Sequence, residues 1–189
     1  MYGKITPSSI SLVIDVGNLN LNATYWQGAE LITDKSITAD LGCAHLIQSL
    51  TQELTAIGIR ADENIIANIL KSEDRSHPEG LTIPDELSLK VKETIKKTIH
   101  KFAEEIKWHC DSRKWPLDLI NVIAIGGTSK LIEEELKDVF KNNIIVLKNP
   151  EYLNVLGYLR IMCAQDPKVA KEIPIDAEPS KEVKEKKAG

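Results

Sequence analysis

The stretch DLINVIAIGGTSKLIEEELKDVF, residues 118–140, constrains the fold more than any other part of the sequence. Apolar residues are nearly continuous from Leu119 to Ile125, as in a strand buried on both faces. After Gly126 and Gly127 they recur at helical spacing. A buried strand that turns tightly into an amphipathic helix is typical of layered α/β domains. The stretch therefore predicts a strand, a glycine turn and a helix.

Other parts of the chain predict elements of the same two kinds. Apolar residues 10–16 indicate a second buried strand, and the alternation that follows, interrupted at Gln27 and Gly28, indicates a β-hairpin. Helical spacing of apolar residues predicts further helices. The remaining expected elements are helices over 44–57, 85–106 and 149–163, a strand in NIIANIL (64–70) and a short strand in NNIIVL (142–147).

This mixture of buried strands and long helices predicts an α/β fold in which helices flank a mixed central sheet. A chain of 189 residues is long enough to bury one sizeable core. We expect one domain over residues 1–165. Residues 166–189 contain spaced prolines and many charged side chains. They cannot bury enough apolar surface to offset the entropy cost of ordering the chain, so we expect a disordered tail.

Charge and composition exclude several classes of function. The net charge is −4, and lysines and arginines cluster only in the C-terminal tail, which disfavours direct binding of nucleic acid. The sequence contains no run of about 18 apolar residues, so it predicts no membrane span, and the N-terminus lacks the pattern of a signal peptide. Three cysteines lie far apart in the sequence, as expected for reduced thiols, so we expect a cytoplasmic protein.

The first candidate for ligand binding is IDVGNLNLN, residues 14–22, at the end of the first strand. Ligands of open α/β sheets collect at the carboxyl ends of strands. Here Asp15 would orient Mg²⁺ through its waters, and Gly17 would let the backbone approach a phosphate. Backbone N–H groups from Gly17 to Asn20 would form an anion-binding concavity. The structural alternative is an asparagine-rich turn that only reverses the chain.

Gly126 and Gly127 form the second candidate. Because neither residue has a Cβ atom, a purine ring or a ribose can approach the backbone closely at this turn. Glycines also serve the geometry of such turns alone, and that alternative stays open. The two loops follow strands that are far apart in sequence but can share one sheet. Together they predict a single ligand site.

Four segments, in this order, resemble the actin-like ATPase superfamily and within it the plasmid-partition ParM/StbA type. LVIDVGNLNLN resembles the second phosphate loop, and ITADLGCAHLIQSL resembles the strand that leads through a Leu-Gly turn into a helix. VIAIGGTSKLIEEELK is similar to the adenosine motif, and NPEYLNVLGYLRI to the helix after it. The segments span about Ile10 to Met162 and match only the second, C-terminal domain of an actin-like protein.

The resemblance implies an actin-like (ribonuclease H-like) domain that binds ATP or GTP with Mg²⁺. Its phosphate loop would consist of Asp15, Gly17, Asn18, Leu19 and Asn20. Asp15 and Gly17 match the family pattern, whereas the last three positions are those where members commonly carry glycine and threonines. An asparagine amide can still donate to a phosphate, but leucine offers only its backbone N–H, so we expect weakened phosphate contact.

The resemblance assigns Gly126, Gly127 and Thr128 to adenosine binding. Thr128 stands where many relatives have a third glycine. It therefore adds a Cβ and a hydroxyl that would either contact the ribose or crowd it.

For function, the resemblance implies half of a ParM-like protein that polymerises into filaments with nucleotide, in plasmid or DNA segregation. The implied partners are further copies of the chain, a missing first actin-like domain and a DNA-segregation adaptor. The chain would come from a truncated gene or from a split or engineered protein. Because the first phosphate loop is missing, we expect no ATP turnover by the chain alone. The alternative is an interaction module that assembles without nucleotide.

Overall fold

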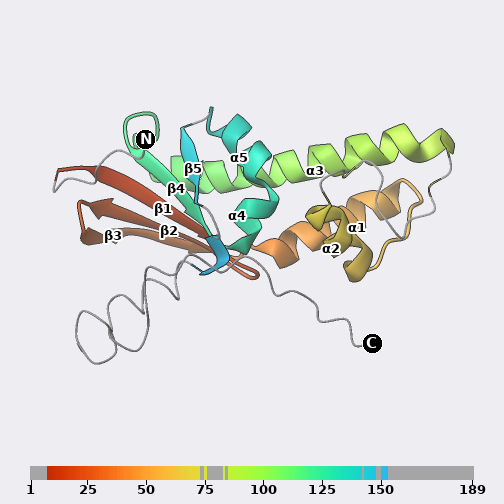
Figure 1. Ribbon diagram of the computed structural model, residues 1–189, viewed down its shortest axis with the longest axis horizontal. Coiled ribbons are helices and arrows are strands. Elements are labelled where there is room, and N and C mark those ends of the chain that lie inside the picture. The colour runs from red at the N-terminus through yellow and green to blue at the C-terminus, as the bar shows by residue number, and fades with distance from the viewer. Residues whose placement is uncertain are drawn as a thin grey trace, which may run out of the picture. The chain divides into compact units, whose positions relative to one another are not determined.

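The computed structural model describes residues 8–72, 75, 83, 85–141, 143–147 and 150–152 (Figure 1). The fold is built around one mixed sheet. Its central strand, β1, pairs with an antiparallel strand on one side and a parallel strand on the other. The order across the sheet is β3-β2-β1-β4-β5. The strands are β1 (Ile10–Val16), β2 (Leu21–Gln27), β3 (Glu30–Ala39), β4 (Asn121–Ile125) and β5 (Ile144–Val146).

The first three strands form a meander, and β1, β4 and β5 are parallel to one another. This arrangement confirms the predicted hairpin and the mixed sheet with flanking helices. The turn between β2 and β3 uses Gly28 with a φ of +57°, a conformation that glycine adopts without a steric cost. In β2, Leu21, Ala23 and Tyr25 are buried and alternate with more exposed residues, as the sequence pattern indicated.

The helices lie beside the sheet, and α3 runs between α1 and α5 (Figure 1). They are α1 (Cys43–Ala56), α2 (Glu63–Lys71), α3 (Asp85–Asp111), α4 (Gly127–Leu131) and α5 (Glu133–Val139), and a 3-10 turn, η1, follows at Pro150–Tyr152. The apolar stripe predicted for α3 is buried throughout: Val91, Ile95, Ile99, Phe102 and Ile106 are each at most 2% exposed. Within the described residues no helix combines the length and apolar character needed to cross a membrane.

The predicted strand NIIANIL is wrong, because these residues belong to the helix α2. Asp62 caps this helix, and its carboxylate accepts a hydrogen bond of 2.9 Å from the N–H of Ile65. Ile66, Ile69 and Leu70 are buried at helical spacing. The β-branched isoleucines suggested a strand, but the cap and the spacing of three and four residues determine the structure.

Two further boundaries differ from expectation. The strand predicted from Leu119 begins at Asn121, since Leu119 is 86% exposed and lies in the preceding turn. The helix predicted after Gly127 is broken at Ile132, whose φ of −121° separates α4 from α5. The break still leaves Ile132, Leu136 and Phe140 buried, so the predicted apolar face is preserved.

Several expectations fall outside the described residues. The helix predicted over 149–163 is described only as far as Tyr152, and the tail 166–189 is not described at all. The predicted boundary between domain and tail therefore stays a prediction.

Candidate functional site

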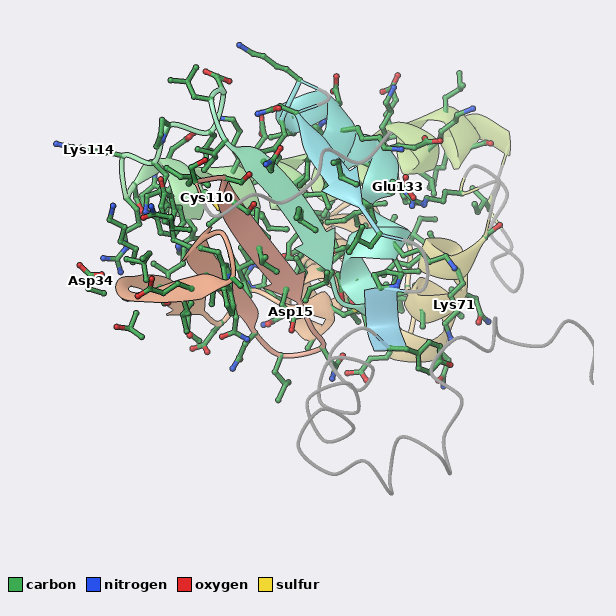
Figure 2. The ribbon with its side chains drawn as sticks, turned by 60° about the vertical axis from the view of Figure 1, so that its left-hand side comes forward. Asp15, Asp34, Lys71, Cys110, Lys114 and Glu133 are labelled. Atoms are coloured by element: carbon green, nitrogen blue, oxygen red, sulfur yellow. The ribbon has the colours of Figure 1, made fainter. Side chains whose placement is uncertain are left out.

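The two candidate loops lie side by side at one edge of the sheet. β1 and β4 are parallel neighbours, with Asp15 opposite Ile125 in the register. The residues that follow each strand therefore emerge at the same edge, where Figure 2 shows Asp15 close to the ends of both strands. The structure thus brings together the two loops that the sequence predicted to share a site.

The two loops approach each other closely at Gly126. Its φ of +87° favours glycine, and a Cβ atom built there would lie 2.5 Å from Oδ1 of Asp15 and 2.5 Å from the carbonyl oxygen of Val16. No other residue type fits this position without moving the strand end that carries Asp15. The absent side chain of Gly126 is therefore what allows the Asp15 carboxylate to lie against the second loop.

Thr128 connects the two loops directly. Its hydroxyl donates a hydrogen bond of 2.9 Å to the carbonyl oxygen of Gly17, and only 3% of the residue is exposed. A hydroxyl that is buried and already donating within the protein is poorly placed to donate to a ribose. Thr128 therefore acts on the first loop, a role that the sequence did not reveal.

The N-terminus of α1 also holds the first loop. The N–H of Cys43 donates to the carbonyl of Gly17 over 3.1 Å, and the N–H of Ala44 donates to the carbonyl of Asn18 over 2.9 Å. Gly42 permits this approach, because a Cβ there would overlap the backbone of Asn18. The first amides of α1 are thus used to fix the loop, which turns the carbonyls of Gly17 and Asn18 towards the helix.

The backbone donors available to an anion are fewer than the sequence predicted. The N–H of Gly17 donates to the carbonyl of Asn20 over 2.9 Å, and the N–H of Gly126 donates to the carbonyl of Pro150 over 3.0 Å. Within the described part of the chain, the N–H groups of Asn18 and Leu19 donate to no other residue. Leu19 is 67% exposed, so this part of the loop faces solvent.

Cys43 lies at the same edge, at the start of α1. Partial burial raises the pKa of its thiol, while a hydrogen bond with Thr128 and the charge of Lys71 oppose that shift. A protonated thiol is a poor nucleophile, which agrees with a packing role for this residue. Among the described residues, no three histidine, cysteine or acidic side chains are grouped so that they could hold a metal ion.

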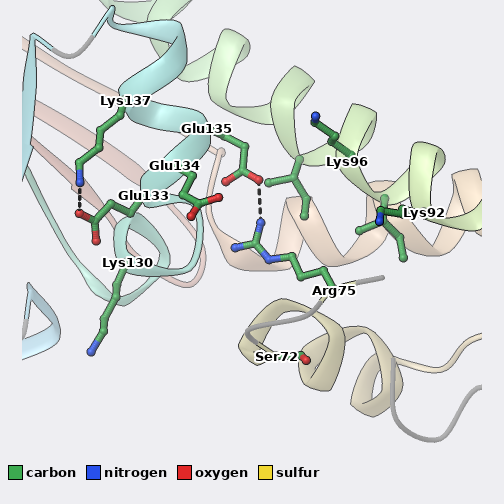
Figure 3. A pocket seen from close by; sticks show the side chains of 11 residues that line it. Ser72, Arg75, Lys92, Lys96, Lys130, Glu133, Glu134, Glu135 and Lys137 are labelled. Carbon is green, nitrogen blue, oxygen red and sulfur yellow. Dashed lines mark hydrogen bonds and ion pairs between the residues drawn. The ribbon is translucent and has the colours of Figure 1, made fainter. Parts of the chain in front are cut away.

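A groove of about 660 Å³ adjoins α4, α5 and α3 (Figure 3). Arg75, from the segment after α2, crosses it: the guanidinium lies 2.7 Å from Oε1 of Glu135 and also donates to the carbonyl of Leu131. Lys92 and Lys96 of α3 line the opposite wall. Sequence reasoning missed this groove, because Arg75 and Glu135 are 60 residues apart and no pattern in the sequence indicates that their side chains meet.

Comparison with solved structures identifies the fold. The first match is a non-polymerisable quadruple mutant of pCBH ParM, with a TM-score of 0.66 and 19% identity over 85% of this chain and 48% of that one. A ParM filament from Clostridium botulinum matches with a TM-score of 0.62 and 20% identity over 82% and 45% of the two chains. An archaeal actin homologue in complex with ADP matches with a TM-score of 0.58 and 20% identity over 84% and 51%.

No protein-family model matches the sequence, and no curated protein matches it. The structural matches confirm the predicted actin-like fold. The chain spans about half the length of the actin-like proteins that it matches.

Proposed function

We propose that this chain is the C-terminal half of a ParM-like, filament-forming actin-like protein whose polymerisation depends on ATP or GTP and serves the segregation of plasmid or other DNA. The observation that carries the proposal is the contact between the two loops, in which Gly126 leaves room for the Asp15 carboxylate. ParM filaments and an ADP complex among proteins of the same fold support it. The further partners would be a first actin-like domain and an adaptor protein that carries the DNA.

Each loop would contact a different part of the nucleotide. The amides of Asn18 and Leu19 and the side chains of Asn18 and Asn20 would donate to phosphate oxygens. Asp15 would hold Mg²⁺ through water, and the bound cation would neutralise phosphate charge. The groove beside α4 would take the nucleoside end, with Gly127 exposed at the start of that helix.

The chain alone would bind nucleotide weakly and would not turn it over. Phosphoryl transfer depends on holding the terminal phosphate in line with a water molecule, which in the proposed whole protein requires a second wall. The amides of Gly17 and Gly126 are used within the protein, and Leu19 offers no side-chain donor. Binding energy must therefore come from few contacts.

The alternative function is an actin-like interaction module that assembles without nucleotide. Leu19 favours it, because an apolar side chain that is 67% exposed replaces a polar donor at the tip of the loop. Such a module would keep the fold and its contacts with other copies while the loops serve only as turns.

Titration calorimetry with ATP and GTP, each with Mg²⁺, separates the two proposals. We expect a dissociation constant of about 1 mM and a roughly tenfold loss for Asp15→Ala. Asp34→Ala is the matched control, because Asp34 is an exposed acid on β3, away from the loops. Equal, undetectable binding by all variants would favour the nucleotide-independent module. Sustained phosphate release that Asp15→Ala abolishes would contradict the half-protein proposal.

A further inference from the structure

One exposed side of α3 has a charge pattern that inverts about His100. Lys96 lies four residues before His100, and Glu104 lies four residues after it. Glu93 lies seven residues before, and Lys107 seven residues after. Reversing the direction of the helix about His100 therefore exchanges each of these charges for its opposite.

These five residues share one face of the helix, named here the His100 strip. At 100° per residue, Lys96 and Glu104 project about 40° to either side of His100, and Glu93 and Lys107 about 20° to either side. Glu93, Lys96 and Glu104 are exposed, and the side chains of His100 and Lys107 are 39% and 30% exposed. The residues of the buried apolar stripe lie about 100–180° around α3 from His100, and solvent reaches all five positions of the strip. One edge of the strip borders α5, where Nδ1 of His100 lies 3.6 Å from Oδ2 of Asp138.

The surface beside the strip is hollowed and carries an exposed aromatic side chain. A hollow of about 330 Å³ between α3 and α5 is lined by His100, Glu104 and Trp108, among others. Trp108 is 64% exposed, although aromatic residues of this size normally bury most of their surface. Tryptophan is enriched at protein–protein contacts.

We propose that the His100 strip is a contact between two copies of this chain, which pair with their α3 helices antiparallel about a two-fold axis at His100. Lys96 of each copy then lies beside Glu104 of the other, and Glu93 beside Lys107. The interface is isologous, so every pair occurs twice.

This contact goes beyond the proposed function, because a head-to-tail filament contact joins two different surfaces and this one joins a surface to itself. It requires no nucleotide. Exposed ion pairs each contribute little and are screened by salt, so the isolated pair is weak and dissociates as salt rises. The contact gains importance where copies are already held close to one another, as they are in an assembly.

Disulfide trapping tests the position of the axis. In His100→Cys the new cysteine lies on the two-fold axis and meets its own copy. In the control, Asn64→Cys, the new cysteine takes an exposed position on α2, away from the strip. Under mild oxidation without nucleotide, we expect about tenfold more linked dimer from His100→Cys. Equal yields from the two variants would overturn the proposal. The native cysteines are present in both variants and cancel from the comparison.

Charge reversal tests the pairing without new cysteines. Lys96→Glu and Glu104→Lys should each weaken dimerisation about tenfold, because each change enters the symmetric interface twice, and the double variant should recover it. Lys101 lies about 100° around the same helix from His100, so Lys101→Glu should leave dimerisation unchanged. Sedimentation equilibrium gives the constants. A wild-type chain that stays monomeric at about 1 mM, or a double variant that does not recover, would overturn the proposal. Nucleotide-dependent pelleting is measured separately, so failure of the proposed function is distinguishable.

Discussion

The hydroxyl of Thr128 donates to the carbonyl oxygen of Gly17 over 2.9 Å, which joins two loops that lie 111 residues apart in the sequence. The same carbonyl accepts the N–H of Cys43, the first residue of α1. One backbone oxygen thus connects the end of β1, the start of α1 and the start of α4. The geometry of the candidate site depends on this junction.

Thr128→Val should therefore destabilise the chain by about 1 kcal/mol, because valine keeps the shape of threonine but removes the donated hydrogen bond. The loss should stay near this value, since the N–H of Cys43 still donates to Gly17. Chemical denaturation measures it. Thr38→Val is the control: its hydroxyl donates to the side chain of Asn22 on the exposed surface, and we expect a change within about 0.5 kcal/mol. Equal losses of stability in the two variants would show that the hydrogen bond of Thr128 contributes no more than one on the exposed surface.

The framework of this site was predictable from the sequence because its signals are local. The apolar runs around Asp15 and before Gly126 predicted two buried strands, and the glycines predicted where each strand turns. Parallel strands that share a sheet end at the same edge, so the two loops had to approach each other. These expectations depend on neighbouring residues only, and the structure confirms them.

The details of the site were not predictable, because they depend on residues that meet only in the folded chain. Nothing in the spacing of Thr128 indicates that its hydroxyl would reach Gly17. Gly42 and Arg75 also act across long sequence separations, one against the backbone of the first loop and the other on α5. The error at α2 has a different cause, since the capping role of Asp62 was overlooked in a segment rich in β-branched residues.

Gly126→Ala should be more destabilising than Gly58→Ala, although the two glycines have nearly equal φ angles of +87° and +86°. Both changes carry the cost of a side chain at positive φ, about 1 kcal/mol. Only at Gly126 would the new methyl group meet Asp15 and Val16, whereas nothing lies within 4 Å at Gly58. We expect an additional loss of about 1–3 kcal/mol at Gly126, measured as the difference in unfolding free energy. Equal losses would mean that the two loops are not in close contact.

Asp62→Ala should lower stability by about 1 kcal/mol, because the N–H of Ile65 loses its acceptor at the start of α2. Asp34→Ala removes an exposed carboxylate from β3 and should change stability by less than about 0.5 kcal/mol. Hydrogen exchange would localise the effect, with faster exchange across residues 63–71 in the Asp62 variant alone. Unchanged exchange there would indicate that burial of the isoleucines is sufficient to hold the helix.

The buried thiol of Cys110 should make the folded chain less stable at alkaline pH. Burial, with a smaller contribution from the charge of Asp111, raises its pKa from 9.0 to about 12, against the opposing charge of Lys107. Below pH 9 the thiol is protonated in both states, and its contribution is fully present. Between pH 9 and about 12 the unfolded chain loses this proton and the folded chain keeps it, so stability falls by up to ~1.4 kcal/mol per pH unit.

Comparison with Cys110→Ala isolates this contribution from that of other groups that titrate in the same range. At pH 8 the variant should be less stable than the wild type, because alanine leaves part of a fully buried site empty. As pH rises above 9, the wild type should lose its advantage and then become the less stable chain, since only it carries the buried thiol. Denaturation curves at pH 8, 9, 10 and 11 would measure the difference. A difference that stays constant over this range would show that Cys110 ionises equally easily in the folded and unfolded chains.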